Sequence, residues 1–126
     1  MKNDRKFLRC EICGNTVGMI EDSGANIVCC GQDMTLLSPN TVDAAQEKHI
    51  PVAKWEDGKL VVTVGSTAHP MTEEHHIAWI AIAHGKLTQR ASLDHTGAPS
   101  VTFLMDKSPV TIYAYCNLHG LWMAKA

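Results

Sequence analysis

The pattern of apolar and polar positions predicts β-structure in the later part of the chain, beginning at residue 59. Residues 59–64, Lys-Leu-Val-Val-Thr-Val, are rich in β-branched side chains and follow the turn dipeptide Asp57-Gly58. Residues 76–82 are apolar at nearly every position, which indicates a strand with a core on one face and another layer or subunit on the other. The same criteria predict strands over residues 87–93, 100–105 and 110–116. Short strands separated by turns favour a β-sandwich.

The strand predicted over residues 110–116 places a cysteine at the end of an apolar row. Because side chains alternate along a strand, Val110, Ile112, Ala114 and Cys116 share one face. We expect this face to point inward, so that the sulfur of Cys116 lies at the inner end of the strand.

The first 36 residues hold few large apolar side chains. A unit this small cannot bury enough surface to offset its chain entropy without a cross-link such as a metal ion. Residues 37–41 favour a linker, because Pro39 restricts the backbone and its Ser, Asn and Thr neighbours favour turns. We therefore predict one domain over residues 1–37 and a second over 38–126, with a short helical turn only within 41–48.

Composition narrows the classes of function. The 126 residues carry a formal net charge of −2, and their basic side chains form no stripe that could follow a nucleic-acid backbone. Apolar residues make up 45% of the chain, yet no apolar run reaches the roughly 20 residues of a membrane-spanning helix. The charged segment 1–6 is unlike an export signal. We expect a soluble, cytoplasmic protein without a nucleic-acid or membrane partner.

The cysteines point to metal binding, since a reducing compartment disfavours structural disulfides. Cys10 and Cys13 have the Cys-x2-Cys spacing that lets one turn present two sulfurs to one ion. Cys29 and Cys30 are adjacent, so the backbone must distort to direct both sulfurs at that ion. Four thiolates in a tetrahedron suit zinc or iron about equally.

A second set of candidate ligands lies in the later part of the chain and combines imidazoles with one thiolate. Four histidines and a cysteine exceed the four ligands that zinc normally takes and leave an octahedral ion one open position, which favours iron. Pro70 biases the preceding histidine towards an extended conformation. His76, His84 and His95 are interpreted as ordinary histidines, although His76 competes with its neighbour for the site. The predicted ligands are His49, His69, His75, Cys116 and His119.

Two other classes of protein fit part of this pattern. Cys116-x2-His119-x3-Met123 on a β-sandwich is similar to the ligand loop of a blue-copper electron carrier, but it leaves the other histidines unused. A structural zinc-ribbon module would use the four cysteines alone, with incidental histidines.

The motifs together resemble those of the desulfoferrodoxin family, the two-iron superoxide reductases, over essentially the whole chain. The motifs that carry this resemblance are Cys10-x2-Cys13, Cys29-Cys30, Glu47-Lys48-His49-Ile50-Pro51, His69-Pro70-Met71-x3-His75 and Cys116-Asn117-x-His119-Gly120.

The resemblance implies an all-β protein with a small desulforedoxin-like (rubredoxin-like) N-terminal domain and an immunoglobulin-like β-sandwich. It implies two non-haem iron ions per chain, one held by the four N-terminal cysteines and one by the four histidines and Cys116. The implied reaction is the one-electron reduction of superoxide to hydrogen peroxide at an open ferrous centre. Lys48 would attract the anion, and Glu47 would close the ferric site. A rubredoxin-like electron donor and a homodimer are also implied.

Overall fold

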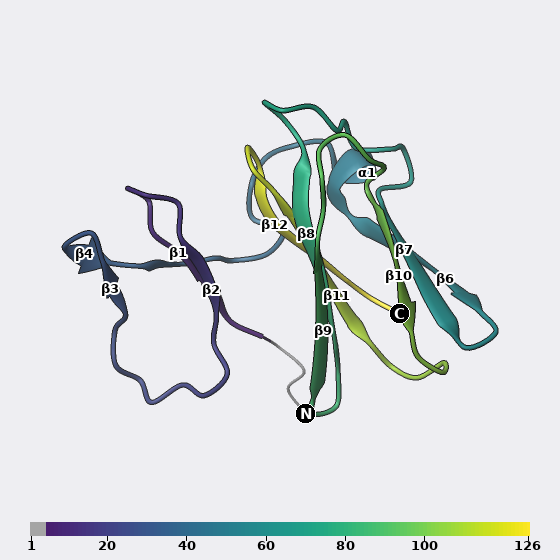
Figure 1. Ribbon diagram of the computed structural model, residues 1–126, viewed down its shortest axis with the longest axis horizontal. Helices are drawn as coiled ribbons and strands as arrows, with labels where there is room; N and C mark the ends of the chain where they lie inside the picture. Colours follow the sequence, from purple (N-terminus) through teal and green to yellow (C-terminus); the bar gives the residue numbers. More distant parts are fainter. Residues whose placement is uncertain (1–4) are drawn as a thin grey trace. The chain divides into compact units, whose positions relative to one another are not determined.

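The computed structural model describes residues 5–126 and divides the chain into two compact units, one ending at Ser38 and the other beginning at Pro39 (Figure 1). Each unit has its own β-structure. None of the helices within residues 5–126 has the length and apolar character needed to cross a membrane.

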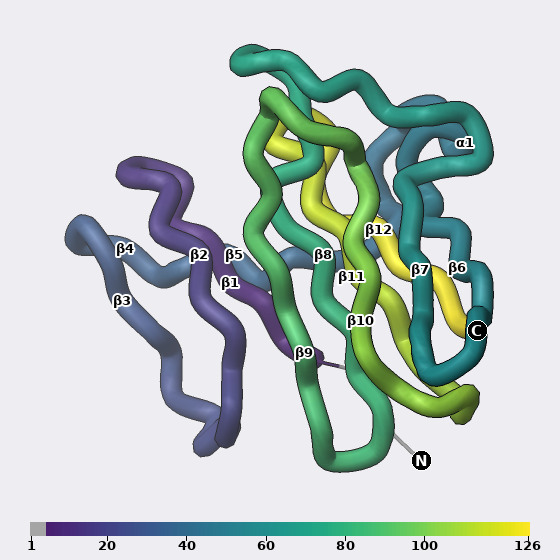
Figure 2. The backbone as a smooth tube through the Cα atoms, turned by 45° about the vertical axis from the view of Figure 1, so that its right-hand side comes forward, coloured from purple at the N-terminus to yellow at the C-terminus, as the bar shows by residue number. Residues whose placement is uncertain are grey.

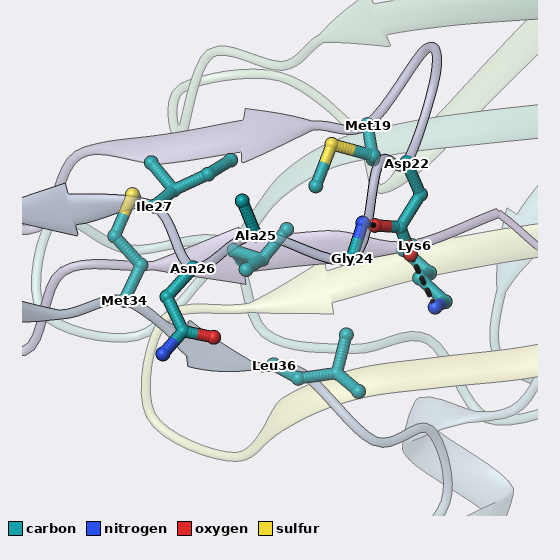
Figure 3. Close-up of a pocket in the computed structure, with 10 residues that line it drawn as sticks. Lys6, Met19, Asp22, Gly24, Ala25, Asn26, Ile27, Met34 and Leu36 are labelled. Carbon is teal, nitrogen blue, oxygen red and sulfur yellow. Dashed lines mark hydrogen bonds and ion pairs between the residues drawn. The ribbon is translucent and has the colours of Figure 1, made fainter.

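The N-terminal unit is built from very short antiparallel strands. Among its described residues, Phe7, Cys10 and Met34 are buried, so a cysteine is part of its small core. A groove on this unit is lined by Leu8, Met19, Ile27 and other side chains, and Lys6 pairs with Asp22 at 2.6 Å beside it (Figure 3). Within residues 5–126 the sheet has the order β2-β1-β5, from β1 (Phe7–Arg9), β2 (Thr16–Gly18) and β5 (Thr35–Leu36), and β3 (Val28–Cys29) pairs with β4 (Gln32–Asp33).

The C-terminal unit is a sandwich of two antiparallel sheets (Figure 2). Over the described residues, one sheet has the order β10-β7-β6, from β6 (Pro51–Glu56), β7 (Lys59–Val64) and β10 (Ser100–Leu104). The other has the order β12-β11-β8-β9, from β8 (Ile77–His84), β9 (Leu87–Ser92), β11 (Thr111–Cys116) and β12 (Gly120–Lys125). The all-β prediction is confirmed.

The predicted strands agree closely with the observed ones, and the differences have local causes. Strand β7 has the predicted bounds, whereas β8 begins one residue later and ends two residues later than predicted. Strand β6 was not predicted, because it begins at a proline and alternates with charged residues, as an edge strand can. The short helical turn is present but ends one residue beyond the predicted stretch: α1 spans Gln46–His49, and Pro51 cannot continue it.

A contiguous core fills the space between the two sheets. Leu60, Val62 and Val64 from β7 face Ile80 and Ile82 from β8, and all are fully buried. The predicted inward row of β11 belongs to this core and comprises Val110, Ile112, Ala114 and Cys116. The sulfur of Cys116 therefore lies at the end of the apolar interior.

Two candidate metal centres

The four N-terminal cysteines converge. Within residues 5–126, the sulfurs of Cys10, Cys13, Cys29 and Cys30 all lie within 4.8 Å of one another. The sulfur of Cys29 is 3.6 Å from that of Cys13 and 4.0 Å from that of Cys30. These distances exceed a disulfide bond, and the cysteines are free. Metal–sulfur bonds of about 2.3 Å in a tetrahedron separate two sulfurs by roughly 3.8 Å, so the spacing fits one metal ion.

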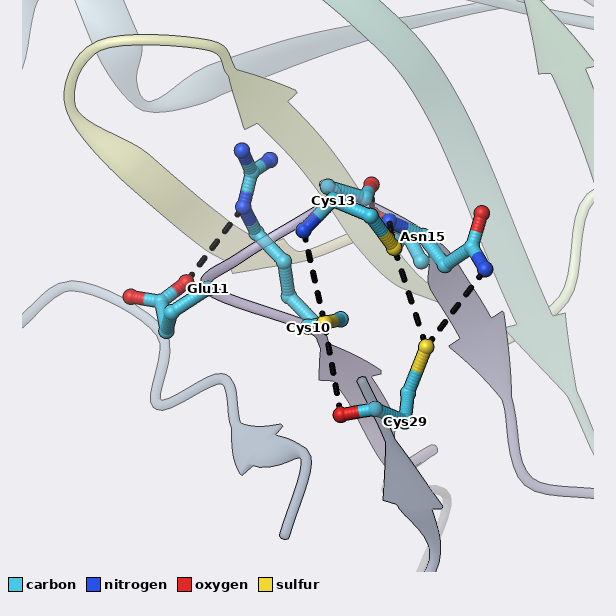
Figure 4. Close-up of polar contacts among 8 residues, drawn as sticks. Cys10, Glu11, Cys13, Asn15 and Cys29 are labelled. Atoms are coloured by element: carbon cyan, nitrogen blue, oxygen red, sulfur yellow. Dashed lines mark hydrogen bonds and ion pairs between the residues drawn. The ribbon is translucent and has the colours of Figure 1, made fainter. Parts of the chain in front are cut away.

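Main-chain and amide N–H groups are directed at these sulfurs. The Cys13 N–H donates to the Cys10 sulfur (3.5 Å) and the Asn15 N–H to the Cys13 sulfur (3.4 Å). The Asn15 side-chain amide donates to the Cys29 sulfur at 3.6 Å (Figure 4). Gly14 has a φ of +82° and closes the turn through its N–H, which donates to the Cys10 carbonyl. These donors favour negative charge on sulfur.

The hydrogen bonds within this cluster shift the pKa values of two of its thiols in opposite directions. The hydrogen bond from the Cys13 N–H lowers the pKa of Cys10 to about 6. Side-chain hydrogen bonds with Cys13, Cys10 and Cys29 raise the pKa of Cys30 to about 12, because they favour the protonated thiol and so penalise its ionisation. A bound cation removes this penalty, so the cluster is suited to a metal ion.

The backbone distortion predicted at the adjacent cysteines is present. Cys30 has a φ of +53°, in the left-handed region, and Gly31 follows with a φ of +77°. Consecutive side chains in extended backbone diverge. The left-handed conformation at Cys30 turns its sulfur towards that of Cys29.

In the sandwich, the ring centroids of four histidines lie at the corners of a square, which we call the imidazole square. Ring centroids are 4.7 Å apart for His49 and His69, 4.7 Å for His69 and His75, 5.0 Å for His75 and His119, and 4.9 Å for His119 and His49. Neighbouring rings are steeply inclined, at 76–87°. Across the square, His49 and His75 are 6.4 Å apart. A metal ion about 2.1 Å from each nitrogen would place opposite centroids roughly 6.4 Å apart, so the square fits one central ion.

The residues of the square come from one end of the sandwich. His49 ends α1, just before β6 begins. His69 and His75 lie on the connection between β7 and β8, which passes beside α1 in Figure 2. Cys116 ends β11, and His119 lies in the turn before β12. A register shift in the β11–β8 pairing between Tyr115 and Cys116 lies next to the cysteine.

Hydrogen bonds fix which nitrogen of two histidines faces the centre. His49 Nδ1 is 2.6 Å from the Ala45 carbonyl and His69 Nδ1 is 2.7 Å from the Pro70 carbonyl. A carbonyl can only accept, so each Nδ1 carries the hydrogen and each Nε2 offers a lone pair. His119 differs, since its Nδ1 lies 3.1 Å from His49 Nε2 and 3.8 Å from the Cys116 sulfur.

Two nitrogens of this cluster are left without a hydrogen-bond partner over residues 5–126. The buried Nε2 atoms of His69 and His75 find no hydrogen-bond partner among the described residues. Burial lowers the pKa values of His49 and His75 and lowers that of His69 to about 4. Burial also raises the pKa of Cys116. Metal ions bind neutral imidazoles and thiolates. The lowered histidine pKa values favour neutral imidazoles, and a bound cation would favour ionisation of the Cys116 thiol.

Three of these histidines and the cysteine form the tightest group. The donor atoms of His49, His75, Cys116 and His119 lie within 4.8 Å of one another. His69 is outside that group, but its ring lies as close to His49 and His75 as any ring of the square. Like that of His75, its Nε2 has no hydrogen-bond partner among the described residues.

The structure separates the two neighbouring histidines at positions 75 and 76. His75 joins the square, whereas the His76 ring lies 5.9 Å from that of His95, and its Nδ1 lies 2.8 Å from the Thr72 carbonyl. The interpretation of His76 and His95 as non-ligands remains a prediction, as it does for His84, whose Nε2 is buried without a partner among the described residues.

The sequence analysis missed residues that orient the square without joining it. The ring of Trp122 lies 4.9 Å from that of His49, and its Nε1 donates to the His119 carbonyl. The carbonyls of Ala45 and Pro70 act in the same way on two histidines. Backbone acceptors leave no signal in a sequence. Trp122 follows the last motif by two residues, and only that proximity could have indicated it.

Glu47 and Lys48 lie on α1, beside the square, and both side chains are exposed. The pKa values of His49 and His75 are lowered first by burial, and the charge of Lys48 adds a smaller lowering effect to each. Glu47 has the opposite effect on His49. Both charged groups therefore act on the cluster electrostatically.

The fold and the two sites define a class of protein: a β-sandwich metalloprotein with a separate four-thiolate centre. A family model described as desulfoferrodoxin matches residues 41–125, and one described as desulfoferrodoxin, N-terminal domain, matches residues 2–37. The chain belongs to the desulfoferrodoxin family.

Individual proteins agree with this assignment. The desulfoferrodoxin of Syntrophotalea carbinolica is 46% identical over 126 residues, which cover 99% of each chain. That of Nitratidesulfovibrio vulgaris is 40% identical over 100% of both chains. The solved structure of the superoxide reductase from Treponema pallidum matches with 37% identity and a TM-score of 0.79, covering 96% of this chain and 98% of that one.

Proposed function

We propose that this protein is a superoxide reductase, which reduces superoxide by one electron to hydrogen peroxide. The observation that carries the proposal is the square of four imidazoles with a buried thiolate beside it. The solved relative from Treponema pallidum is itself named a superoxide reductase. The overall change is superoxide plus one electron and two protons, giving one hydrogen peroxide.

In this proposal five donors of the sandwich would hold an iron ion, which would supply one-electron chemistry between its ferrous and ferric states. The donors are Nε2 of His49, His69 and His75, Nδ1 of His119, and the sulfur of Cys116. A second iron belongs to Cys10, Cys13, Cys29 and Cys30, whose sulfurs have tetrahedral spacing.

The two faces of the imidazole square differ. Cys116 is fully buried and belongs to the core, so its sulfur approaches the square from the interior. His75 and His119 are only partly buried, and Lys48 is exposed on the neighbouring turn. This asymmetry supports an open position on the side away from the sulfur, where a small anion can enter.

Lys48 and Glu47 act at this open side. The flexible Lys48 ammonium raises the local concentration of an anion and holds a proton-donating water close to it. Glu47, one residue earlier, would close the ferric site with its carboxylate. Their electrostatic effects on His49 and His75 support roles close to the square.

The electrons come from a partner, for which we propose a small redox protein such as a rubredoxin. Leu118 is 59% exposed beside His119, and Ile12 is 62% exposed beside Cys13. Exposed apolar side chains next to both centres suit brief docking of such a protein.

We also propose a homodimer in the cytoplasm. The free cysteines favour a reducing compartment, and light scattering of the iron-loaded protein tests the dimer.

Neither alternative class fits the geometry as well. Met123 and Trp122 are neighbours on β12, and neighbouring side chains on a strand point to opposite faces. Because Trp122 packs against His49, Met123 is directed away from the square and cannot complete a blue-copper site. A structural zinc module does not explain why the histidines converge.

The deciding experiment measures products. Ascorbate-reduced protein, with its metals quantified, is mixed anaerobically with a known amount of potassium superoxide dissolved in dimethyl sulfoxide. A superoxide reductase yields one hydrogen peroxide for each superoxide and no oxygen. A yield of half as much peroxide, accompanied by oxygen, indicates dismutation and contradicts the proposal, as does failure to consume superoxide.

A further inference from the structure

The short helix α1 cannot hold its own position. It spans only Gln46–His49, and an isolated turn of this length is unstable in water. Ala45 at its N-cap has no side chain that can accept a hydrogen bond from the helix. The Glu47 carbonyl also lacks its usual helical partner, because that position is Pro51, which has no N–H.

The connection between β7 and β8 satisfies this carbonyl. The Thr67 N–H donates to the Glu47 carbonyl at 2.8 Å, and the Ser66 hydroxyl donates to it at 3.2 Å. Two donors from one loop therefore hold the peptide group that joins Glu47 to Lys48. Both charged residues of the open side are attached to that peptide.

Gly65 makes this approach possible. A Cβ atom at Gly65 would lie 2.7 Å from the Glu47 carbonyl oxygen, 3.0 Å from the Ile50 carbonyl oxygen and 3.0 Å from the Lys48 carbonyl carbon. All three neighbours are backbone atoms, which cannot rotate away as a flexible side chain would. Gly65 does not have a left-handed φ, so the requirement for glycine at this position is close packing.

The same loop carries a candidate ligand. The His69 N–H donates to the Val64 carbonyl at 2.9 Å, and the Gly65 N–H to the Thr67 carbonyl at 3.3 Å, which makes the loop compact. One end of the loop thus fixes His69 in the imidazole square, while its middle fixes the backbone of Lys48.

We propose that residues 65–67 form a clamp that positions Lys48 at the open side of the imidazole square. Gly65 permits contact with α1, and the Ser66 hydroxyl and Thr67 N–H hold the Glu47 carbonyl. The three are positioning residues and act on superoxide only through Lys48. This inference rests on the proposed function, because it assigns the clamp to the anion-attracting residue.

The experiment compares iron-loaded Gly65→Ala with wild type, each with and without Lys48→Ile. The bimolecular rate with superoxide is measured by pulse radiolysis over a range of ionic strength. Gly97→Ala is the matched control, because a Cβ there would meet its nearest neighbour, the Asp94 carbonyl oxygen, at an ordinary 3.6 Å.

We expect Gly65→Ala to slow the reaction by about three- to tenfold and to flatten its dependence on salt, as displacement of one steering cation should. In the Lys48→Ile background it should have little further effect. Equal slowing in both backgrounds would show that Gly65 acts through His69 or the fold instead, and would overturn the clamp. A rate equal to that of Gly97→Ala would also overturn it.

Ser66 gives a milder second test, for use if Gly65→Ala does not fold. Ser66→Ala removes one of the two donors to Glu47 and should slow the reaction in the same Lys48-dependent way, whereas Ser66→Thr, which keeps the hydroxyl, should restore it. Unchanged kinetics in Ser66→Ala would contradict the clamp.

The failure of the clamp and the failure of the proposed function give different results. If the wild-type protein does not convert superoxide to peroxide, the proposed function is refuted. If only the clamp is wrong, the wild-type protein is active and Lys48→Ile is slow.

Discussion

The indole Nε1 of Trp122 donates a hydrogen bond to the carbonyl oxygen of His119 at 3.1 Å. The same indole packs against the ring of His49, with centroids 4.9 Å apart. One buried side chain on β12 therefore orients two histidines of the imidazole square from outside it.

We expect Trp122→Phe to destabilise the protein by about 1 to 3 kcal/mol, because it keeps an aromatic ring beside His49 but leaves the His119 carbonyl without its donor. Denaturant melts of the iron-loaded protein measure this loss, and visible spectra report any change at the metal. Trp55→Phe, the same substitution at a half-buried position on β6, should leave the spectrum unchanged. An unchanged spectrum in Trp122→Phe would mean that the indole does not orient the site.

Lys48→Ile should slow the reaction with superoxide roughly tenfold, the lower end of electrostatic steering effects. An anion attracted by one cation also feels salt screening, so the ionic-strength dependence should flatten. Stopped-flow or pulse-radiolysis rates at several salt concentrations measure both effects. Lys54→Ile removes another exposed lysine, on β6, and should keep the wild-type slope. If both variants behave alike, only the total charge matters.

Cys13→Ser should remove or alter the first metal while superoxide reduction continues. The sulfur of Cys13 lies 3.6 Å from that of Cys29, so its replacement breaks the four-thiolate set. The donors of the second site all lie after Pro39, in the other unit. Metal analysis and the superoxide rate of the same sample provide the test. A large loss of activity with the second iron still bound would show that the first centre takes part in the reaction.

Acidification should destabilise the metal-free protein. Burial lowers the pKa of His69 from 6.5 to about 4, so between these values the unfolded chain binds more protons than the folded one. Stability then rises with pH and falls as the pH drops from 6.5 towards 4, by at most about 3 kcal/mol for this residue. Denaturant melts of metal-free protein across this range measure the slope. His69→Gln should flatten it, while His95→Gln, outside the square, is the matched control.

The sequence by itself determined most of the elements and the two groups of metal-binding residues. The β-branched side chains of residues 59–64 and the turn dipeptide before them predicted β7 with its bounds, because β-branched residues favour extended backbone. The Cys-x2-Cys spacing and the adjacent cysteines predicted one cluster because short spacing limits where the sulfurs can go, and Cys30 has the expected distortion.

Only the tertiary structure decided how the histidines of the site are oriented, because their orientation depends on contacts between segments that are distant in the sequence. The carbonyls of Ala45 and Pro70 decide which nitrogen His49 and His69 present to the square, and the Thr72 carbonyl holds the ring of His76. Every residue has such a carbonyl group, so the sequence does not mark these three. The contact of Gly65 with Glu47 is equally invisible in the sequence, since a glycine near a strand end indicates only a turn. Backbone groups carry no residue identity, so only the folded chain shows which of them orient the site.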